Sequence, residues 1–162
     1  MDSLNVYRAE KKDIDILFDL INGLALYEKR PQDMTGTKEE LIYWIFEKNI
    51  ATSFLAEYNG EIIGYALYYP IFGSFSAKGK VHLEDIFIKE EYRGKGFGKY
   101  FFEKVAEDVL NSGYAEMEWS CLDWNSPSIN FYNKLGAEEE TGRVYFGFEK
   151  EDLEKIVKKS TN

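Results

Sequence analysis

Tyr92-Arg93-Gly94-Lys95-Gly96-Phe97-Gly98-Lys99 joins a strand-like run to a helix-like run, and no other stretch narrows the choice of fold as much. Glycines at alternate positions let the backbone turn tightly and bring its N–H groups toward an anion without Cβ atoms in the way. A helix that begins here adds the positive end of its dipole. The flanking Arg93, Lys95 and Lys99 carry matching charge. The stretch predicts a pyrophosphate cradle, the alternative being a basic, flexible turn.

Two better-known phosphate loops do not fit this stretch. Its spacing is G-x-G-x-G, whereas the dinucleotide fingerprint is G-x-G-x-x-G. Gly98-Lys99 is followed by Tyr100, where a Walker loop needs Ser or Thr. We therefore expect neither NAD nor ATP as the ligand.

The motif and its order along the chain resemble a known superfamily. Arg93 to Gly98 reads R-x-x-G-x-G after the strand-like run Val81 to Ile88, and it is similar to the acyl-CoA loop of the GNAT N-acetyltransferases. Trp124-Asn125-Ser126-Pro127-Ser128-Ile129-Asn130-Phe131-Tyr132 and Lys134-Leu135-Gly136-Ala137 resemble the second conserved block of that superfamily. Three segments are similar to its spermidine/spermine and thialysine N-acetyltransferase branch: Leu83-Glu84-Asp85-Ile86-Phe87-Ile88, Tyr92-Arg93-Gly94 and Pro127-Ser128-Ile129-Asn130-Phe131-Tyr132.

The resemblance implies an α/β protein with the GNAT, or acyl-CoA N-acyltransferase, fold. In that fold a mixed, mostly antiparallel central sheet is flanked by helices. A chain of 162 residues, 44% hydrophobic and 30% charged, suits one globular domain, which we expect to cover residues 1–162. Its apolar runs are too short to cross a bilayer, and its first residues lack a signal-peptide pattern, so we expect a soluble, cytoplasmic protein.

The charge of the chain limits its partners. A formal net charge of −9 argues against nucleic acid or an anionic membrane and would steer a cationic substrate inward. The alternative is that the acidic excess merely keeps the protein soluble. Cys121 is the only cysteine, so an intrachain disulfide is excluded, and we expect no metal site. It lies in a strand-like run, where a buried, inert thiol is expected.

Hydrophobic periodicity and turn signals predict the element order βααβββαβαβα. The expected strands are Val6 to Arg8, Ser53 to Tyr58, Glu61 to Tyr69, Val81 to Ile88, Glu116 to Leu122 and Arg143 to Glu149, with a hairpin at Asn59-Gly60 and a loop from Gly73 to Gly79. The expected helices are Lys12 to Glu28, a second that starts at the capping box Thr37 to Glu40, Gly98 to Asn111, Ser126 to Leu135 and Glu151 to Lys158. Apolar residues recur at helical spacing in the first three: Ile16, Leu17, Leu20, Ile21 and Leu24; Leu41, Trp44 and Ile45; Phe101, Phe102, Val105 and Val109.

Acetyl transfer from a thioester needs an unprotonated amine, a polarised carbonyl and a proton for the leaving thiolate. Glu84, just before the cradle, is the best placed base, because a charge is uncommon within such an apolar strand. A salt-bridged or rim carboxylate is the alternative. His82, the only histidine, shares the face of Glu84 by the period of a strand and is the second candidate base, although a structural histidine is also common there.

The resemblance implies further site residues. It makes Tyr132 the general acid, since a phenol stays protonated at neutral pH and can protonate a thiolate. It also implies contacts to acyl-CoA from Ile86, Phe87, Ile88, Arg93, Gly94, Lys95, Gly96, Phe97, Gly98, Lys99, Asn125, Ser128, Asn130, Tyr132 and Lys134. The amides of Asn125 and Asn130 could instead cap the following helix, and for Asn125 we expect both roles.

The amine side is expected to be acidic. Tyr27-Glu28 resembles the substrate-side pair of the polyamine branch, and Asp85 adjoins Glu84. Strand alternation sets Asp85 on the face opposite Glu84 unless a bulge intervenes. Glu140 could match another family carboxylate, but a solvated acidic turn is the preferred interpretation of Glu138-Glu139-Glu140.

The sequence thus predicts an N-acetyltransferase that moves acetyl from acetyl-CoA to a primary amine of a small cationic molecule by direct attack in a ternary complex. The resemblance also implies a homodimer. Two alternatives stay open at this point. One changes the acceptor to an amino acid, an antibiotic or a protein N-terminus, and the other is a non-catalytic acyl-CoA-binding sensor.

Overall fold

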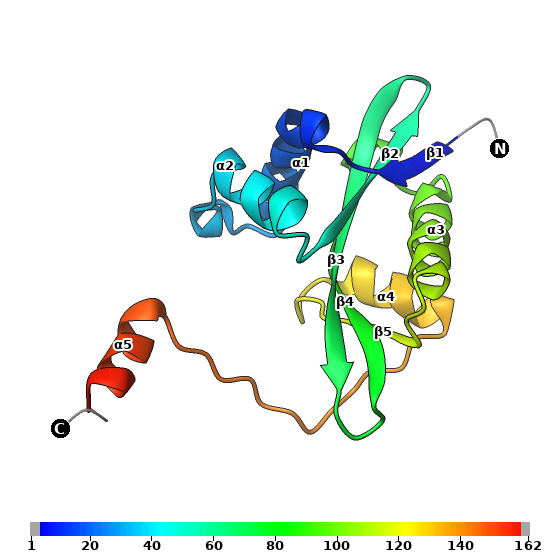
Figure 1. The fold of residues 1–162 in the computed structure, drawn as a ribbon. Helices are drawn as coiled ribbons and strands as arrows, with labels where there is room; N and C mark the ends of the chain where they lie inside the picture. Colours follow the sequence, from blue (N-terminus) through cyan, green and yellow to red (C-terminus); the bar gives the residue numbers. More distant parts are fainter. Residues whose placement is uncertain (1–3, 160–162) are drawn as a thin grey trace. The chain divides into compact units, whose positions relative to one another are not determined.

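The computed structural model describes residues 4–159. The chain divides into two compact units, the first ending at Ser120 and the second beginning at Cys121 (Figure 1). Within the described residues, the first unit holds the sheet and the second holds two helices. Among the described residues, no helix is long and apolar enough to span a membrane.

The first unit is built on a five-stranded sheet in the order β1-β2-β3-β4-β5. Neighbouring strands pair antiparallel from β1 to β4, whereas β4 and β5 pair parallel through a crossover that contains α3 (Phe97–Asn111). This confirms the mixed, mostly antiparallel sheet predicted from the sequence. The strands are β1 (Leu4–Arg8), β2 (Thr52–Tyr58), β3 (Glu61–Gly73), β4 (Lys78–Ile88) and β5 (Glu116–Trp119).

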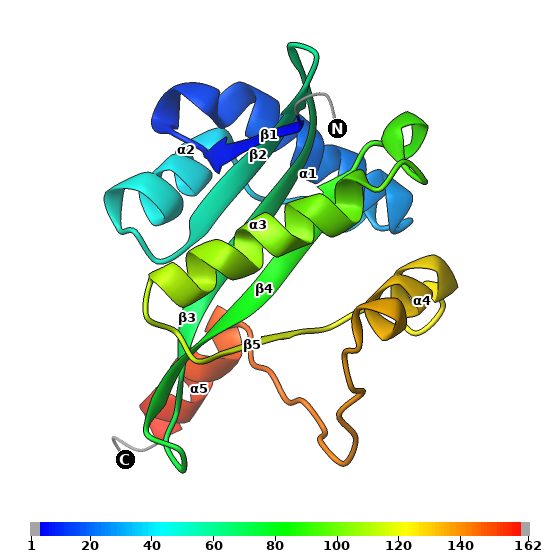
Figure 2. The same ribbon diagram turned by 90° about the vertical axis from the view of Figure 1, so that its right-hand side faces the viewer.

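Helices cover both faces of this sheet (Figure 2). α3 lies on one face over a core that includes Leu83 and Phe101. α1 (Ile14–Tyr27) lies on the other face over Leu17, Tyr65 and Phe87. The core positions predicted along the two helices are confirmed, because each is buried or packs against buried residues: Ile16, Leu17, Leu20, Ile21, Leu24, Phe101, Phe102, Val105 and Val109.

Two local signals fold as the sequence predicts. Glu40 N donates to Thr37 Oγ1 at 3.2 Å and Thr37 N donates to Glu40 Oε2 at 2.9 Å, which completes the capping box. Asn59 and Gly60 take φ values of 51° and 81° between β2 and β3, as a tight hairpin turn of this type requires.

The helix that follows the capping box differs from the prediction. α2 (Lys38–Leu41) makes one turn and continues as the π-helical segment η3 (Ile42–Glu47). Ile45 is buried, but Trp44 is 49% exposed. A π turn is wider than an α turn, so the positions that face the core no longer follow α-helical spacing.

The bounds of β3, β4 and β5 also correct the predicted ones. The expected loop from Gly73 to Gly79 is a short turn, because Gly73 still pairs with Lys78. β5 ends at Trp119, whose partner Leu83 is the last β4 residue that pairs with β5. Cys121 therefore lies outside a strand and is half-buried rather than buried.

The second unit contains α4 (Ser126–Leu135) and α5 (Lys150–Lys159). The predicted strand from Arg143 to Glu149 is wrong, since these residues form no strand. A strand needs a hydrogen-bonding neighbour, and the described part of this unit offers none. Val144, Tyr145 and Phe146 are consequently 77%, 86% and 95% exposed.

Candidate active site

A β-bulge in β4 decides where the carboxylates of this strand point. Leu67 of β3 pairs with Asp85 and Tyr68 pairs with Leu83, so Glu84 is an extra residue without a β3 partner. A single extra residue shifts the side-to-side alternation of a strand.

The core residues on either side of the bulge reveal this shift. Before it, Leu83 packs in the core under α3. After it, Phe87 packs in the core under α1 and Ile88 packs under α3. Glu84 and Asp85 therefore both face the α1 side of the sheet, which fulfils the bulge condition set by the sequence for Asp85.

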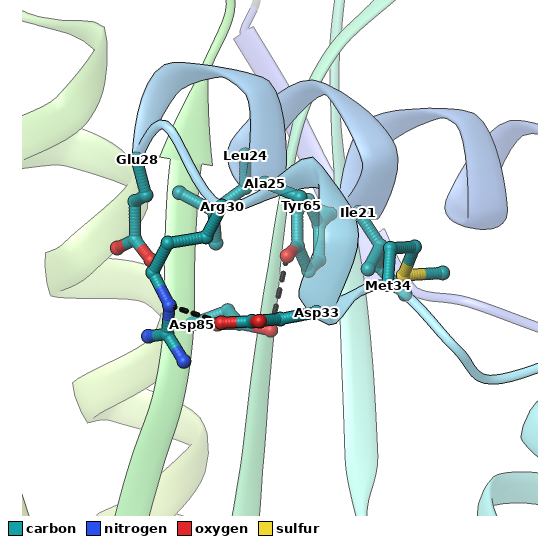
Figure 3. Close-up of a pocket in the computed structure, with 9 residues that line it drawn as sticks. All are labelled: Ile21, Leu24, Ala25, Glu28, Arg30, Asp33, Met34, Tyr65 and Asp85. Atoms are coloured by element: carbon teal, nitrogen blue, oxygen red, sulfur yellow. Dashed lines mark hydrogen bonds and ion pairs between the residues drawn. The ribbon is translucent and has the colours of Figure 1, made fainter.

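A pocket of about 140 Å³ lies beside Asp85, between α1, β3, β4 and the segment after α1 (Figure 3). Tyr65 Oη donates to Asp85 Oδ2 at 2.9 Å, and Arg30 Nε donates to Asp33 Oδ2 at 2.6 Å across the pocket. Glu28 caps the end of α1 and lines the same pocket. The remaining walls are apolar: Ile21, Leu24, Ala25 and Met34.

Two carboxyls that line the pocket, those of Asp85 and Glu28, hold their protons more tightly than usual. Burial raises the pKa of Asp85 to about 7, helped by the charges of Glu84 and Glu28, although the hydrogen bond from Tyr65 opposes the shift. Burial likewise raises the pKa of Glu28, and the charge of Glu84 adds to it while Arg30 opposes it. Three carboxyls that repel one another in this way favour a cationic ligand, which would relieve the repulsion.

His82 and Glu84 share a face, as the sequence predicts. His82 Nε2 lies 3.8 Å from Glu84 Oε2, and His82 Nδ1 lies 3.8 Å from Glu118 Oε1. The imidazole stacks on the Tyr69 ring with 5.2 Å between centroids. Burial, together with a hydrogen bond and the charge of Glu84, raises the pKa of Tyr69. The Glu84 carboxylate is about half exposed, so its oxygens remain accessible to an incoming amine.

β4 leaves part of its outer edge open. Its pairing with β5 covers Lys80 to Leu83 and does not extend over the described residues Glu84 to Ile88. Ile86, Phe87 and Ile88, predicted to contact acyl-CoA, lie on this stretch. An extended, amide-bearing chain such as pantetheine could pair with such an edge.

The cradle has the backbone form that its glycines predict. Gly94 and Gly96 take φ values of 75° and 84°, and Gly96 caps the N-terminus of α3. A Cβ on Gly94 would meet nothing within 4 Å, so this part of the loop borders open space. The first helical bond joins Tyr100 N to Gly96 O, and the N–H groups of Phe97 to Lys99 precede it. These groups fit a pyrophosphate.

The basic side chains of the cradle contact the protein itself. Arg93 Nε donates to Ile88 O at 2.8 Å, and Lys95 Nζ donates to Glu91 O at 2.9 Å. Lys99 Nζ lies 3.7 Å from Glu103 Oε1. The backbone N–H groups at the start of α3 are therefore the groups of this loop best suited to an anion.

The second unit carries the other predicted site residues. Asn125 is buried, and its Oδ1 accepts from Ser128 N at 3.4 Å, so its capping role at α4 is confirmed. Tyr132 is half-buried on α4, with its ring 5.3 Å from that of Phe131. Asn130 and Lys134 are exposed.

Glu140 also belongs to the second unit. It is exposed, and its Oε2 lies 3.7 Å from Arg143 Nη2. This environment is consistent with the solvated acidic turn preferred from the sequence.

Comparison with known proteins connects these features. The model of the acetyltransferase (GNAT) family matches residues 18–137, from α1 past the end of α4. The chain belongs to this family. It is thus an N-acetyltransferase by membership, which sets aside the non-catalytic sensor.

Curated relatives of this GNAT acetyltransferase cover nearly its whole length. Thialysine N-epsilon-acetyltransferase of Mus musculus is 33% identical over 97% of this chain and 99% of its own. Spermidine/spermine N(1)-acetyltransferase-like protein 1 of Homo sapiens is 28% identical over 94% of this chain and 24% of its own. The names of these relatives match the spermidine/spermine and thialysine N-acetyltransferase branch that the sequence motifs suggest.

Solved structures bear out the GNAT fold. An integron cassette protein from V. cholerae superposes with a TM-score of 0.78 over 98% of this chain and 99% of its own, at 22% identity. An aminoglycoside acetyltransferase from an uncultured soil metagenomic sample superposes with a TM-score of 0.77 over 90% of this chain and 97% of its own, at 18% identity.

Sequence reasoning missed part of the acetyltransferase pocket. Tyr65, Arg30 and Asp33 were not among the predicted residues, yet all three line it. Tyr65 carried a usable signal, because a tyrosine within a buried strand needs a partner for its hydroxyl.

Within residues 4–159, no group of three or more His, Cys, Asp or Glu side chains is arranged to hold a metal ion. GNAT acetyltransferases use acetyl-CoA as their acyl donor.

Proposed function

We propose that this acetyltransferase transfers acetyl from acetyl-CoA to a primary amine of a small cationic substrate, a diamine, a polyamine or a thialysine-like amino acid. The observation that carries the proposal is the β4 bulge, because it sets Glu84 and Asp85 on the face that Glu28 also borders. The names of the relatives, thialysine and spermidine/spermine acetyltransferases, support the same substrate class.

The donor side of the proposal rests on backbone. The cradle from Arg93 to Lys99 would bind the pyrophosphate through its N–H groups, and the open edge of β4 at Phe87 and Ile88 would pair with the pantetheine arm. Acetyl-CoA supplies the activated acetyl group when bound. Asn125, Ser128, Asn130 and Lys134 are proposed as further contacts on the strength of the family pattern.

The acceptor side divides the carboxyls by role. Glu84 accepts the proton of the reacting ammonium, directly or through water, with His82 as the alternative base 3.8 Å away. Glu28 and Asp85 bind the charge of a second ammonium beside the apolar wall of the pocket. Tyr27 precedes Glu28 at the end of α1 and completes this side.

The remaining step needs an acid. Tyr132 is proposed to protonate the departing thiolate after direct attack of the amine in a ternary complex, since its phenol is protonated at neutral pH. Its assignment follows the family pattern in α4.

The family match runs across Ser120 and Cys121, which supports one functional domain over residues 1–162. We further propose a cytoplasmic homodimer.

The decisive experiment is turnover with a panel of amines. The full chain is mixed with acetyl-CoA and each amine, and the release of free thiol is followed. Putrescine, spermidine and thialysine should be acetylated faster than butylamine, which lacks a second charge. An aminoglycoside and a peptide with a free N-terminus test the alternative acceptors, and a clear preference for either would overturn the proposed substrate class.

A further inference from the structure

Arg93 contacts both substrate-facing parts of the first unit. Its Nε donates to Ile88 O at 2.8 Å, at the end of the open β4 edge. Its guanidinium carbon lies 4.2 Å from the centroid of the Tyr27 ring and 5.4 Å from that of Phe87. Tyr27 is the last residue of α1, and Glu28 caps that helix in the amine pocket. The Arg93 side chain thus links the cradle, in which Arg93 is the first basic residue, to Tyr27, the neighbour of Glu28.

The contact suits arginine in particular. A guanidinium is planar and weakly hydrated, so it can stack on an aromatic face while one of its N–H groups bonds a carbonyl. A lysine ammonium is a strongly hydrated point charge and cannot reproduce both contacts at once. The side chain of Arg93 is half-buried in this arrangement.

We propose that Arg93 is a positioning residue that couples the two substrate sites. A ligand that fixes the cradle backbone next to Gly94 also fixes Arg93, and Arg93 holds the Tyr27 ring and with it the end of α1. The Glu28 carboxylate is thereby set for the amine when acyl-CoA is bound. Coupling of this kind is reciprocal, so the bound amine must raise the affinity of the protein for CoA by the same factor. This inference rests on the proposed function.

The test measures binding without turnover. The affinity of putrescine for the full chain is determined by calorimetry in the absence and presence of saturating CoA, which carries no acetyl group to transfer. In the natural chain, saturating CoA should raise the affinity for putrescine by about fivefold or more. Arg93→Ala and Arg93→Lys should bring this ratio close to one. Arg143→Lys, at an exposed arginine of the second unit, is the matched control and should keep it.

A second pair of variants tests the other side of the contact. Tyr27→Phe keeps the ring and should retain the coupling, whereas Tyr27→Leu removes the ring and should abolish it. This pair decides the matter if the Arg93 variants do not fold, as judged by their thermal melting. A ratio near one in the natural chain, or an unchanged ratio in folded Arg93→Ala or Tyr27→Leu, overturns the coupling alone. If neither putrescine nor spermidine nor thialysine binds the natural chain, with or without CoA, the proposed function is overturned as well.

Discussion

Asp85 is held by surroundings that favour its protonated form. Its pKa rises to about 7 chiefly through burial, and the charges of Glu84 and Glu28 act in the same direction. An acid whose pKa is higher in the folded than in the unfolded chain lowers stability when it ionises. The folded protein therefore loses stability as pH rises from the ordinary aspartate value, 3.8, through about 7.

Asp85→Asn should remove this loss. The variant is expected to melt at a higher temperature than the natural chain at about pH 8, with the difference shrinking as pH falls toward about 4, where Asp85 is protonated in the folded chain and increasingly protonated in the unfolded chain. Thermal denaturation across this range measures it. Asp123→Asn, at an exposed aspartate, is the control and should show no such trend. A pH-independent difference for Asp85→Asn would contradict the assignment.

The substitutions Glu28→Gln and Glu84→Gln should change the kinetics of the enzyme in different ways. Glu28→Gln removes an anchor remote from the reacting nitrogen, so the KM for putrescine should rise about tenfold while that for butylamine changes little. Glu84→Gln removes the base, so kcat should fall about 100-fold at neutral pH and recover partly as pH rises and more amine is free. Rate profiles with both amines measure this. Identical profiles for the two variants would refute the division of roles.

The cradle and α3 form an element with a left-handed glycine near each end. Gly96 and Gly113 have the same φ of 84° at opposite ends of α3, a region that valine strongly disfavours. Gly96→Val and Gly113→Val should each cost about 1 to 3 kcal/mol of stability. Gly96→Val should in addition raise the KM for acetyl-CoA, because its side chain crowds the N–H donors, while Gly113→Val should not. Steady-state kinetics on the two folded variants separates strain from binding.

Local signals in the sequence were sufficient for the elements that depend on neighbouring residues. The capping box at Thr37, the Asn59-Gly60 turn and the glycine-rich turn before α3 each encode their own backbone form, and these backbone forms were predicted correctly. The sequence could not predict whether β4 contains a bulge at Glu84. A bulge is defined by how β4 pairs with β3, and the sequence of β4 alone does not specify that pairing. The need of the Tyr65 hydroxyl for a partner is likewise visible in the sequence, but the identity of that partner is not, since Asp85 is twenty residues away.

The strand predicted from Arg143 to Glu149 illustrates the limit at the scale of the whole molecule. Its aromatic and β-branched residues have high strand propensity, but propensity supplies no partner edge. Large apolar side chains are left exposed there, among them Tyr145 and Phe146. Such exposure on a contiguous segment is typical of a surface that another chain covers.

A homodimer should therefore depend on this segment. Light scattering is expected to give about twice the chain mass of 18.9 kDa at working concentration. Changing both Tyr145 and Phe146 to serine should weaken the dimer. Phe75→Ser, at a fully exposed phenylalanine between β3 and β4, is the control and should leave the mass unchanged. A monomer for the natural chain would contradict the expectation.

Glu84 is, in the register of the sheet, a surplus residue: Leu83 and Asp85 already pair with adjacent residues of β3. If Glu84 were deleted, the alternation would become regular, with Leu83 still under α3 and Asp85 still facing α1. The proposed proton acceptor thus occupies a position that the scaffold accommodates without displacing any residue of the core. Natural insertion and loss of one codon could switch this chemistry on and off while the fold persists, which is an evolutionary freedom that a base at a regularly paired position would not have.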